Sequence, residues 1–282
     1  MSDHRQRIGI FDSGVGGLTV LRALYRELPD ESFFYFGDTD RLPYGTRSTT
    51  EILQFMREIL TLMTEERVKM AIVACNTSAA LALDTVRSEF PFPILGPILP
   101  GAKAAVTQGR RIGTIATPAT ARSGTYRRAM LEVDRTVQVW EVGCPEFVPL
   151  IEADRIHEPY TEQIARSYLQ LLLDQDIDTL VYGCTHYPHL APILEKILPP
   201  TVKLVDPAIS LAQSAARELD LLGLRSDGSP QPTRFGVSGC PEQFAQLSVQ
   251  WLGFTPFVEK VRLSEVRSSS VPLAPQSIQS RM

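Results

Sequence analysis

The sequence predicts an α/β protein of two similar domains, each with a mostly parallel sheet, and an active site in the cleft between them. Two observations support this fold class. Short apolar runs typical of buried strands alternate with segments of helical periodicity, which is the pattern of a parallel sheet covered by helices on both faces. The pattern also begins a second time, because residues 111–117 resemble residues 7–13.

The composition indicates an ordinary globular protein. The chain has 282 residues, of which 44% are hydrophobic and 21% charged, and this length can bury a core without disulfide or metal cross-links. A net charge of −4 does not favour a nucleic-acid partner. The sequence has no apolar run that could span a bilayer and no N-terminal secretion signal, so we expect no membrane partner and a cytoplasmic location.

The first half of the chain contains predicted strands that alternate with helices. Pro29 stops the first helix, whose apolar residues recur at helical spacing. Ser48 and Glu51 form a predicted capping box before a second helix. In chain order, the predicted elements are a strand at 8–11, a glycine-rich turn at 12–17, the helix at 18–28, a strand at 32–36, a loop at 37–45, the helix after Ser48 and a strand that leads to Cys75.

The second half repeats this order, and the chain then returns to the first domain. The predicted elements are a strand at 111–117, a strand at 179–183, a helix around 212–222 and a strand at 234–239. Four prolines between residues 91 and 100 mark the crossing into the second domain. We therefore expect the first domain to contain residues 1–97 and 208–266, the second to contain residues 98–207, and a mobile tail to follow at 267–282.

Two cysteines, Cys75 and Cys184, occupy matching places in the two halves. Each follows an apolar run and precedes small hydrogen-bonding residues, which are Asn76 and Thr77 after the first and Thr185 after the second. Open α/β sheets bind ligands beyond the carboxyl ends of their strands. We therefore expect one site with a sulfur on each side.

A pair of thiols can exchange the proton of a stereocentre from opposite faces. One sulfur, as the thiolate, removes the proton, while the other, as the thiol, donates one. This chemistry needs neither metal nor cofactor if fixed dipoles stabilise the carbanion, and holding the carbon between the two groups lowers the barrier by orientation. The alternative is that both thiols are simply buried small hydrophobic side chains, as free cysteines often are.

Polar residues near the same strand ends are candidates for binding and proton relay. Asp12 and Ser13 end the first strand, where they can bind a substrate, relay a proton or cap the next helix. The glycines that follow lack the last glycine of a dinucleotide motif and suit a ring of amides that receives a carboxylate. His186 can act on the Cys184 proton, and Glu152 is a candidate supporting carboxylate.

The remaining cysteines and histidines indicate neither a metal site nor a disulfide. Cys184, His186 and His189 have irregular ligand spacing and no CxxC pair accompanies them, so we expect no metal. Cys144 and Cys240 are each followed by proline and lack the context of a strand followed by polar residues. We interpret both as structural.

Five motifs together resemble those of bacterial glutamate racemases, in the aspartate/glutamate racemase superfamily. They lie at residues 11–17, 43–45, 74–77, 142–152 and 183–188, and the resemblance spans residues 7 to about 260. It implies a cofactor-independent isomerase that interconverts L- and D-glutamate and supplies D-glutamate for peptidoglycan. The implied fold has two α/β domains with the site between them, commonly as a homodimer.

The resemblance also implies a role for each matching residue. Cys75 would take the proton from D-glutamate with the help of Asp12. Cys184 would take it from L-glutamate with the help of His186 and Glu152. The residues implied to hold the substrate are Asp12, Ser13, Tyr44, Gly45, Asn76, Thr77, Thr185 and His186, and Thr117 and Thr120 match a less distinctive site motif.

Three other interpretations stay open from the sequence. A racemase of aspartate or a related acid would use the same chemistry, because substrate length depends on contacts within the pocket. A non-enzymatic amino-acid-binding protein would also have two lobes around a cleft. A thiol-dependent lyase or decarboxylase would need only one of the two sulfurs, so the presence of both favours racemisation.

Overall fold

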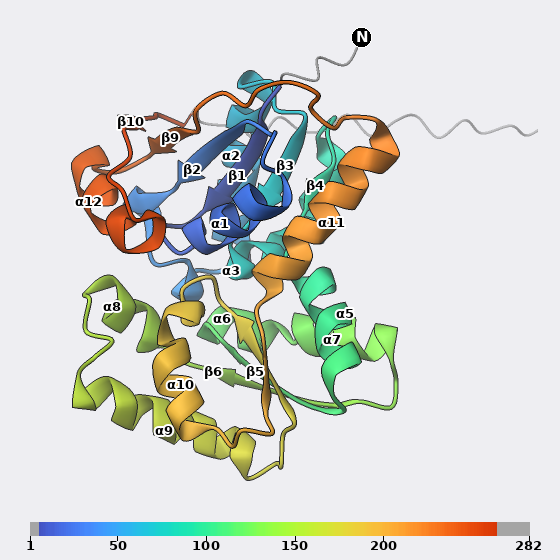
Figure 1. Ribbon diagram of the computed structural model, residues 1–282, viewed down its shortest axis with the longest axis vertical. Coiled ribbons are helices and arrows are strands. Elements are labelled where there is room, and N and C mark those ends of the chain that lie inside the picture. Colours follow the sequence, from blue (N-terminus) through green and yellow to red (C-terminus); the bar gives the residue numbers. More distant parts are fainter. Residues whose placement is uncertain (1–5, 264–282) are drawn as a thin grey trace, which may run out of the picture.

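Ten parallel β-strands form two sheets in residues 6–263, the part of the chain that the computed structural model describes (Figure 1). The two sheets lie in two lobes, and the predicted α/β class is confirmed. The first sheet has the order β10-β9-β2-β1-β3-β4, with β1 Ile8–Asp12, β2 Phe33–Gly37, β3 Met70–Val73, β4 Ile94–Leu95, β9 Arg234–Val237 and β10 Val258–Lys260. The second has the order β6-β5-β7-β8, with β5 Arg111–Ala116, β6 Gln138–Gly143, β7 Thr179–Gly183 and β8 Lys203–Val205.

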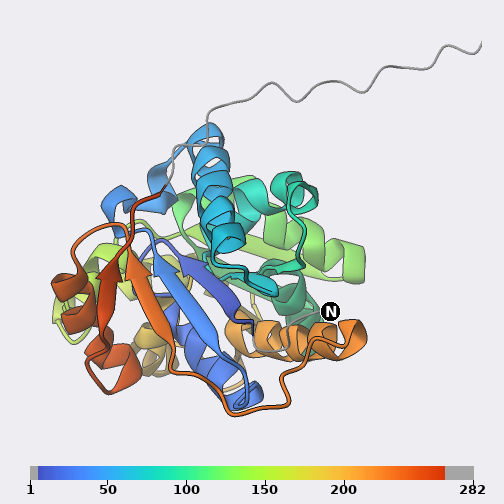
Figure 2. The ribbon, with the colours of Figure 1, turned by 90° about the horizontal axis from the view of Figure 1, so that it is seen from above.

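Helices cover both faces of the first sheet (Figure 2). Helix α1 (Leu18–Glu27) contacts α11 (Pro207–Leu222) and α12 (Pro241–Leu252) on one face, while α2 (Thr49–Glu65) lies on the other. Ile8 and Ile10 of β1 join the buried cluster that contains α1, whereas Phe11 joins the cluster that contains α2. Because both faces are covered, the central strands are buried throughout and form continuous apolar runs.

The second sheet has helices of its own, and two segments join it to the first lobe. Helix α5 follows β4 into the second lobe and packs against α7 and α11. The helices from the β3–β4 connection through the second lobe are α3 Asn76–Ser78, α4 Asp84–Val86, α5 Ile98–Gln108, α6 Pro118–Ser123, α7 Thr125–Val133, α8 Phe147–Glu152, α9 Pro159–Leu173 and α10 Ala191–Ile197. The shorter turns are η1 Thr39–Arg41, η2 Tyr44–Thr46, the π-helical η3 Ala79–Leu83, η4 Arg87–Glu89 and η5 Tyr187–Leu190.

Local signals in the sequence account for several element ends. The predicted capping box is present. The Ser48 side chain accepts a hydrogen bond from the Glu51 amide, and the Glu51 side chain accepts one from the Ser48 amide. Helix α11 begins at Pro207, earlier than predicted, because the Asp206 carboxylate caps the Ala208 amide at 2.9 Å. Strand β4 was not predicted, since two residues between prolines carry no periodic signal.

Two further expectations concern what lies outside the two sheets. The tail expected at 267–282 lies outside the described residues. Within residues 6–263, no helix combines the length and the apolar character that crossing a membrane requires.

Candidate active site

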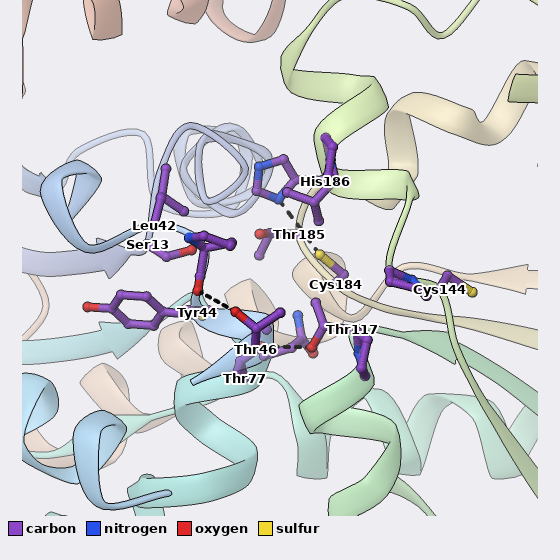
Figure 3. A pocket seen from close by; sticks show the side chains of 18 residues that line it. Ser13, Leu42, Tyr44, Thr46, Thr77, Thr117, Cys144, Cys184, Thr185 and His186 are labelled. Atoms are coloured by element: carbon purple, nitrogen blue, oxygen red, sulfur yellow. Dashed lines mark hydrogen bonds between the residues drawn. The ribbon is translucent and has the colours of Figure 1, made fainter. Parts of the chain in front are cut away.

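A cavity of about 140 Å³ lies at the carboxyl ends of strands from both sheets (Figure 3). Cys75 follows β3 and Cys184 follows β7, and both line this cavity while remaining 5% and 6% exposed. Two parallel sheets that face each other with their carboxyl ends therefore bring together two residues that are far apart in the chain. The lining residues are Ser13, Leu42, Pro43, Tyr44, Gly45, Thr46, Cys75, Asn76, Thr77, Thr117, Pro118, Cys144, Pro145, Val148, Pro149, Cys184, Thr185 and His186.

A histidine and a carboxylate stand in line behind Cys184. The Cys184 sulfur lies 3.7 Å from Nδ1 of His186, and Nε2 of that ring lies 2.9 Å from Oε1 of Glu152 (Figure 3 shows the first contact). Burial lowers the pKa of His186, but the hydrogen bonds to Cys184 and Glu152 outweigh burial and raise this pKa well above its ordinary value. The raised pKa favours the imidazolium form of His186, which would place a positive charge beside the sulfur.

Cys75 has the opposite electrostatic surroundings. Burial, followed by the negative charge of Asp12, raises the pKa of the Cys75 thiol to about 12. Burial also raises the pKa of Asp12, although the positive charge of His186 opposes it. Without a ligand, the raised pKa keeps Cys75 as a neutral thiol that can donate a proton, whereas Cys184 lies next to the His186 ring, whose raised pKa favours the cation.

The glycine-rich turn surrounds the Asp12 carboxylate. Oδ2 of Asp12 accepts hydrogen bonds from the amides of Gly17 at 2.9 Å and Gly14 at 3.3 Å, and the Thr185 hydroxyl donates to Oδ1 at 3.4 Å. The turn was expected to offer its amides to a substrate carboxylate. Two of these amides instead bind the protein's own Asp12, which explains how a fully buried carboxylate is held in place.

Two glycines allow residues of the two lobes to approach each other closely. A Cβ atom on Gly16 would lie 2.3 Å from Nδ1 of His186 and 2.6 Å from Oγ1 of Thr185. A Cβ atom on Gly45 would lie 2.8 Å from Cβ of Thr117. These positions therefore require glycine for the cavity walls to meet.

A buried carboxylate anchors the loop that carries Tyr44 and Gly45. The Tyr44 hydroxyl donates to Asp38, Arg41 pairs with the same carboxylate at 2.6 Å, and the Ser238 hydroxyl donates to it at 2.8 Å. Arg41 also pairs with Glu58 of α2. This network fixes the loop over the cavity through contacts with β9 and α2.

Hydrogen bonds also cross from the segment after β3 to the second lobe. The hydroxyls of Thr77 and Thr117 lie 2.9 Å apart, and Thr120 lies within 3.3 Å of the first and 2.9 Å of the second. The Tyr126 hydroxyl donates to Oδ1 of Asn76 at 2.7 Å. Asn76 and Thr77 are therefore oriented by residues of α6 and α7.

All residues predicted to form the site line the cavity except Asp12, Glu152 and Thr120. Each of these three lies behind the cavity wall and contacts a lining residue: Asp12 is hydrogen-bonded to Thr185, Glu152 to His186, and Thr120 to Thr117. The His189 ring packs on the Trp251 ring, with 4.4 Å between ring centroids. Among residues 6–263, no group of three or more His, Cys, Asp or Glu side chains is placed to hold a metal ion.

The sequence interpretation missed one cysteine of the cavity wall. Cys144 was interpreted as structural for want of a preceding strand, yet it directly follows β6 and lines the cavity. Its sulfur donates to the Val142 carbonyl at 3.6 Å. A Gly-Cys pair occurs at 143–144 and at 183–184, but also at 239–240 outside the cavity, so the pair alone could not distinguish Cys144 from Cys240. The other lining residues absent from the predicted set, for which only proximity to the motifs gave a signal, are Leu42, Pro43, Thr46, Pro118, Pro145, Val148 and Pro149.

Comparisons with known proteins agree with this geometry. A sequence model of the family described as Asp/Glu/Hydantoin racemase matches residues 8–215. A glutamate racemase of a Nostoc species is 63% identical over 267 residues, which cover 95% of this chain and 91% of that protein. The structure of a Bacillus anthracis glutamate racemase isoform superimposes with a TM-score of 0.89 at 36% identity, covering 93% of this chain and 99% of that one. The Francisella tularensis glutamate racemase in complex with D-glutamate gives a TM-score of 0.87 at 32% identity, covering 94% and 99%.

Proposed function

The chain belongs to the glutamate racemases of the Asp/Glu/Hydantoin racemase family, and from this premise we propose that Cys75 and Cys184 together transfer the α-proton of glutamate. The reaction is the interconversion of L- and D-glutamate. The observation that carries the proposal is that both sulfurs line one cavity although they lie in different lobes. A single catalytic thiol would not account for the second.

In the L-to-D direction, the Cys184 thiolate takes the α-proton of L-glutamate and forms an S–H bond. The electron pair of the broken C–H bond stays on a carbanion that its carboxylate delocalises. Cys75, a thiol in the resting enzyme, donates its proton to the opposite face and becomes a thiolate. The reverse reaction uses the same steps in the opposite order, and the two sulfurs exchange protons with solvent between turnovers.

The charged groups around the two sulfurs favour a thiolate at Cys184 and a thiol at Cys75 before L-glutamate reacts. The His186 imidazolium, 3.7 Å from the Cys184 sulfur, stabilises negative charge there, and Glu152 stabilises the imidazolium in turn. Burial and Asp12 keep the proton on Cys75. A thiolate and a thiol on opposite sides of the substrate are the base and the acid that the first step needs.

Hydroxyl and amide donors, together with the His186 ring, hold the substrate. The lining residues include no Lys or Arg within the described part of the chain. We assign the two carboxylates and the ammonium of glutamate to Ser13, Asn76, Thr77 and Thr185, together with Tyr44, Gly45 and His186. Hydroxyl and amide groups fixed by hydrogen bonds across the cleft can stabilise a developing enediolate without reorganising.

The test is racemisation of L-glutamate in deuterium oxide without an added cofactor. We expect loss of circular dichroism together with deuterium at the α-carbon. Cys75→Ser and Cys184→Ser should each abolish turnover, and Cys240→Ser, which alters an exposed cysteine outside the cavity, should not. Retained racemisation in either cavity variant would remove that sulfur from the mechanism. Turnover of aspartate but not of glutamate would refute the assignment of glutamate as the substrate.

The proposal also covers the location, the oligomeric state and the cofactor requirement of the enzyme. We infer a cytoplasmic, cofactor-independent homodimer that supplies D-glutamate for peptidoglycan, with domain bounds at 1–97 plus 208–266 and at 98–207. Sedimentation equilibrium should give twice the mass of the 31.3 kDa chain. Activity should survive dialysis against a chelator and treatment with a carbonyl-trapping reagent. A monomer with full activity would refute the need for a dimer.

A further inference from the structure

Thr19 joins the first lobe to the loop that carries Cys184 and His186. It is the second residue of α1 and lies outside the cavity wall. Its hydroxyl oxygen is 3.1 Å from the Thr185 carbonyl oxygen and 2.8 Å from the Gly16 carbonyl oxygen. The contact with Thr185 crosses between the lobes, because Thr185 follows β7 of the second sheet. Thr185 lies between Cys184 and His186 in the chain, and all three line the cavity (Figure 3), so a shift of its backbone would move both of these side chains.

The sequence deprives the Thr185 carbonyl of the donor that its own turn would otherwise supply. Around η5, the amides of Tyr187 and His189 each donate to the carbonyl three residues earlier, at 3.2 and 3.1 Å. The residue three positions after Thr185 is Pro188, which has no N–H group. The Thr19 hydroxyl therefore offers a hydrogen bond at the one place in this series where the backbone cannot.

The Thr19 hydroxyl has one hydrogen and two carbonyl oxygens within reach. The Gly16 carbonyl already accepts the Thr19 amide at 3.0 Å. Thr185 is buried, and a buried carbonyl without a donor carries a desolvation cost, so the hydrogen contributes more at Thr185 than at Gly16. The Thr185 hydroxyl in turn donates to Oδ1 of Asp12 at 3.4 Å, which means that the first lobe holds Thr185 at both its backbone and its side chain.

We propose that Thr19 is a positioning residue for the racemisation: its hydroxyl holds the Thr185 carbonyl and thereby fixes the loop that carries Cys184. This inference rests on the proposed two-thiol reaction, in which both sulfurs must reach the same carbon. Cys75 belongs to the first lobe, so the contact sets the position of one sulfur relative to the other. Loss of the hydroxyl should slow proton transfer without abolishing it.

The direct test is the NMR signal of the Thr185 carbonyl carbon. His186 is the one histidine in the sequence that follows a threonine. Labelling threonine with ¹³C at its carbonyl and histidine with ¹⁵N therefore gives a single HNCO cross-peak, which joins the Thr185 carbonyl to the His186 amide. In Thr19→Val, which removes the hydroxyl at nearly constant shape, we expect the carbonyl resonance to move upfield because the hydrogen bond is lost. Thr19→Ser keeps the hydroxyl and should leave the cross-peak close to its wild-type position.

Racemisation rates test what the contact does. Carbon atoms keep about 3.3–3.6 Å from carbonyl oxygens, whereas the hydroxyl lies at 3.1 Å, so the valine methyl group should displace the loop by roughly 0.2–0.5 Å. A misplacement of about 1 Å in an active site can cost on the order of a hundredfold in rate. We therefore expect kcat of Thr19→Val to fall roughly three- to tenfold in both directions, and Thr19→Ser to keep most of the wild-type rate.

Thr61→Val is the matched control. Thr61 of α2 is also half-buried, and its hydroxyl donates to the Arg57 carbonyl of its own helix at 2.8 Å, outside the cavity wall. This variant should keep the wild-type rate and the wild-type cross-peak. A cross-peak in Thr19→Val that stays in place, a kcat that stays at the wild-type value, or an equal fall of kcat in Thr61→Val would each overturn the proposal. Racemisation by Cys75→Ser would instead refute the two-thiol reaction itself, whatever the position of the cross-peak.

Discussion

Replacing Gly16 by alanine should disrupt the site at the point where the two lobes meet. The new Cβ would lie 2.3 Å from Nδ1 of His186, the atom that faces Cys184, and 2.6 Å from the Thr185 hydroxyl. To reach ordinary contact, the imidazole must retreat by about 1 Å, and a misplacement of about 1 Å in an active site can cost on the order of a hundredfold in rate. We therefore expect kcat to fall on the order of a hundredfold.

The assay for Gly16→Ala is the initial rate of racemisation in both directions, with thermal unfolding measured alongside it. Gly228→Ala is the control, because a Cβ on Gly228 meets no atom within 4 Å and its backbone is not left-handed. That variant should keep the wild-type rate. A folded Gly16→Ala enzyme with wild-type kcat would refute the argument that His186 must stay at its observed distance from Cys184.

Three further predictions follow from individual contacts. Glu152→Gln removes the carboxylate that is 2.9 Å from His186, so the pKa of His186 in an NMR titration should fall and kcat should drop roughly tenfold or more. Burial lowers the pKa of His189 from 6.5 to about 4, so between these pH values the unfolded chain binds more protons than the folded protein. The free energy of unfolding should therefore decrease as pH falls from 6.5 to about 4. Urea titrations of His189→Gln should show a weaker decrease. Tyr126→Phe removes the 2.7 Å hydrogen bond to Asn76, so KM should rise by a factor of roughly five, and an unchanged KM would contradict the orienting role.

Much of the site could be predicted from the sequence because its chemistry is carried by short motifs at strand ends. Cys75 and Cys184 each follow a buried strand, and the topology of a parallel sheet places such residues at one edge. His186 is close to Cys184 in the chain, so its position beside that sulfur could be anticipated as well. Residues whose position depends only on their own motif were therefore accessible.

What the sequence could not supply are the contacts between lobes. No pattern indicates that Gly16 lies against His186, or that Thr77 meets Thr117 and Thr120 across the cleft. These contacts depend on the relative placement of two sheets, which hydrophobic periodicity does not encode. Asp12 illustrates the same limit. The sequence does not indicate whether its carboxylate binds a ligand or the amides of its own turn, and the structure shows hydrogen bonds from the Gly14 and Gly17 amides.

The two lobes present their thiols in a similar way but stabilise charge on them differently. A racemase has an equilibrium constant of one, which fixes the ratio of kcat/KM in the two directions and leaves the protonation of the free enzyme unconstrained. Here the pair of His186 and Glu152 stabilises negative charge on the Cys184 sulfur, whereas burial beside Asp12 keeps the proton on Cys75. In the proposed reaction, L-glutamate would therefore meet the resting form directly. Release of D-glutamate would leave Cys75 as the thiolate, which burial beside Asp12 disfavours, so the free enzyme would return to its resting form through proton exchange with solvent.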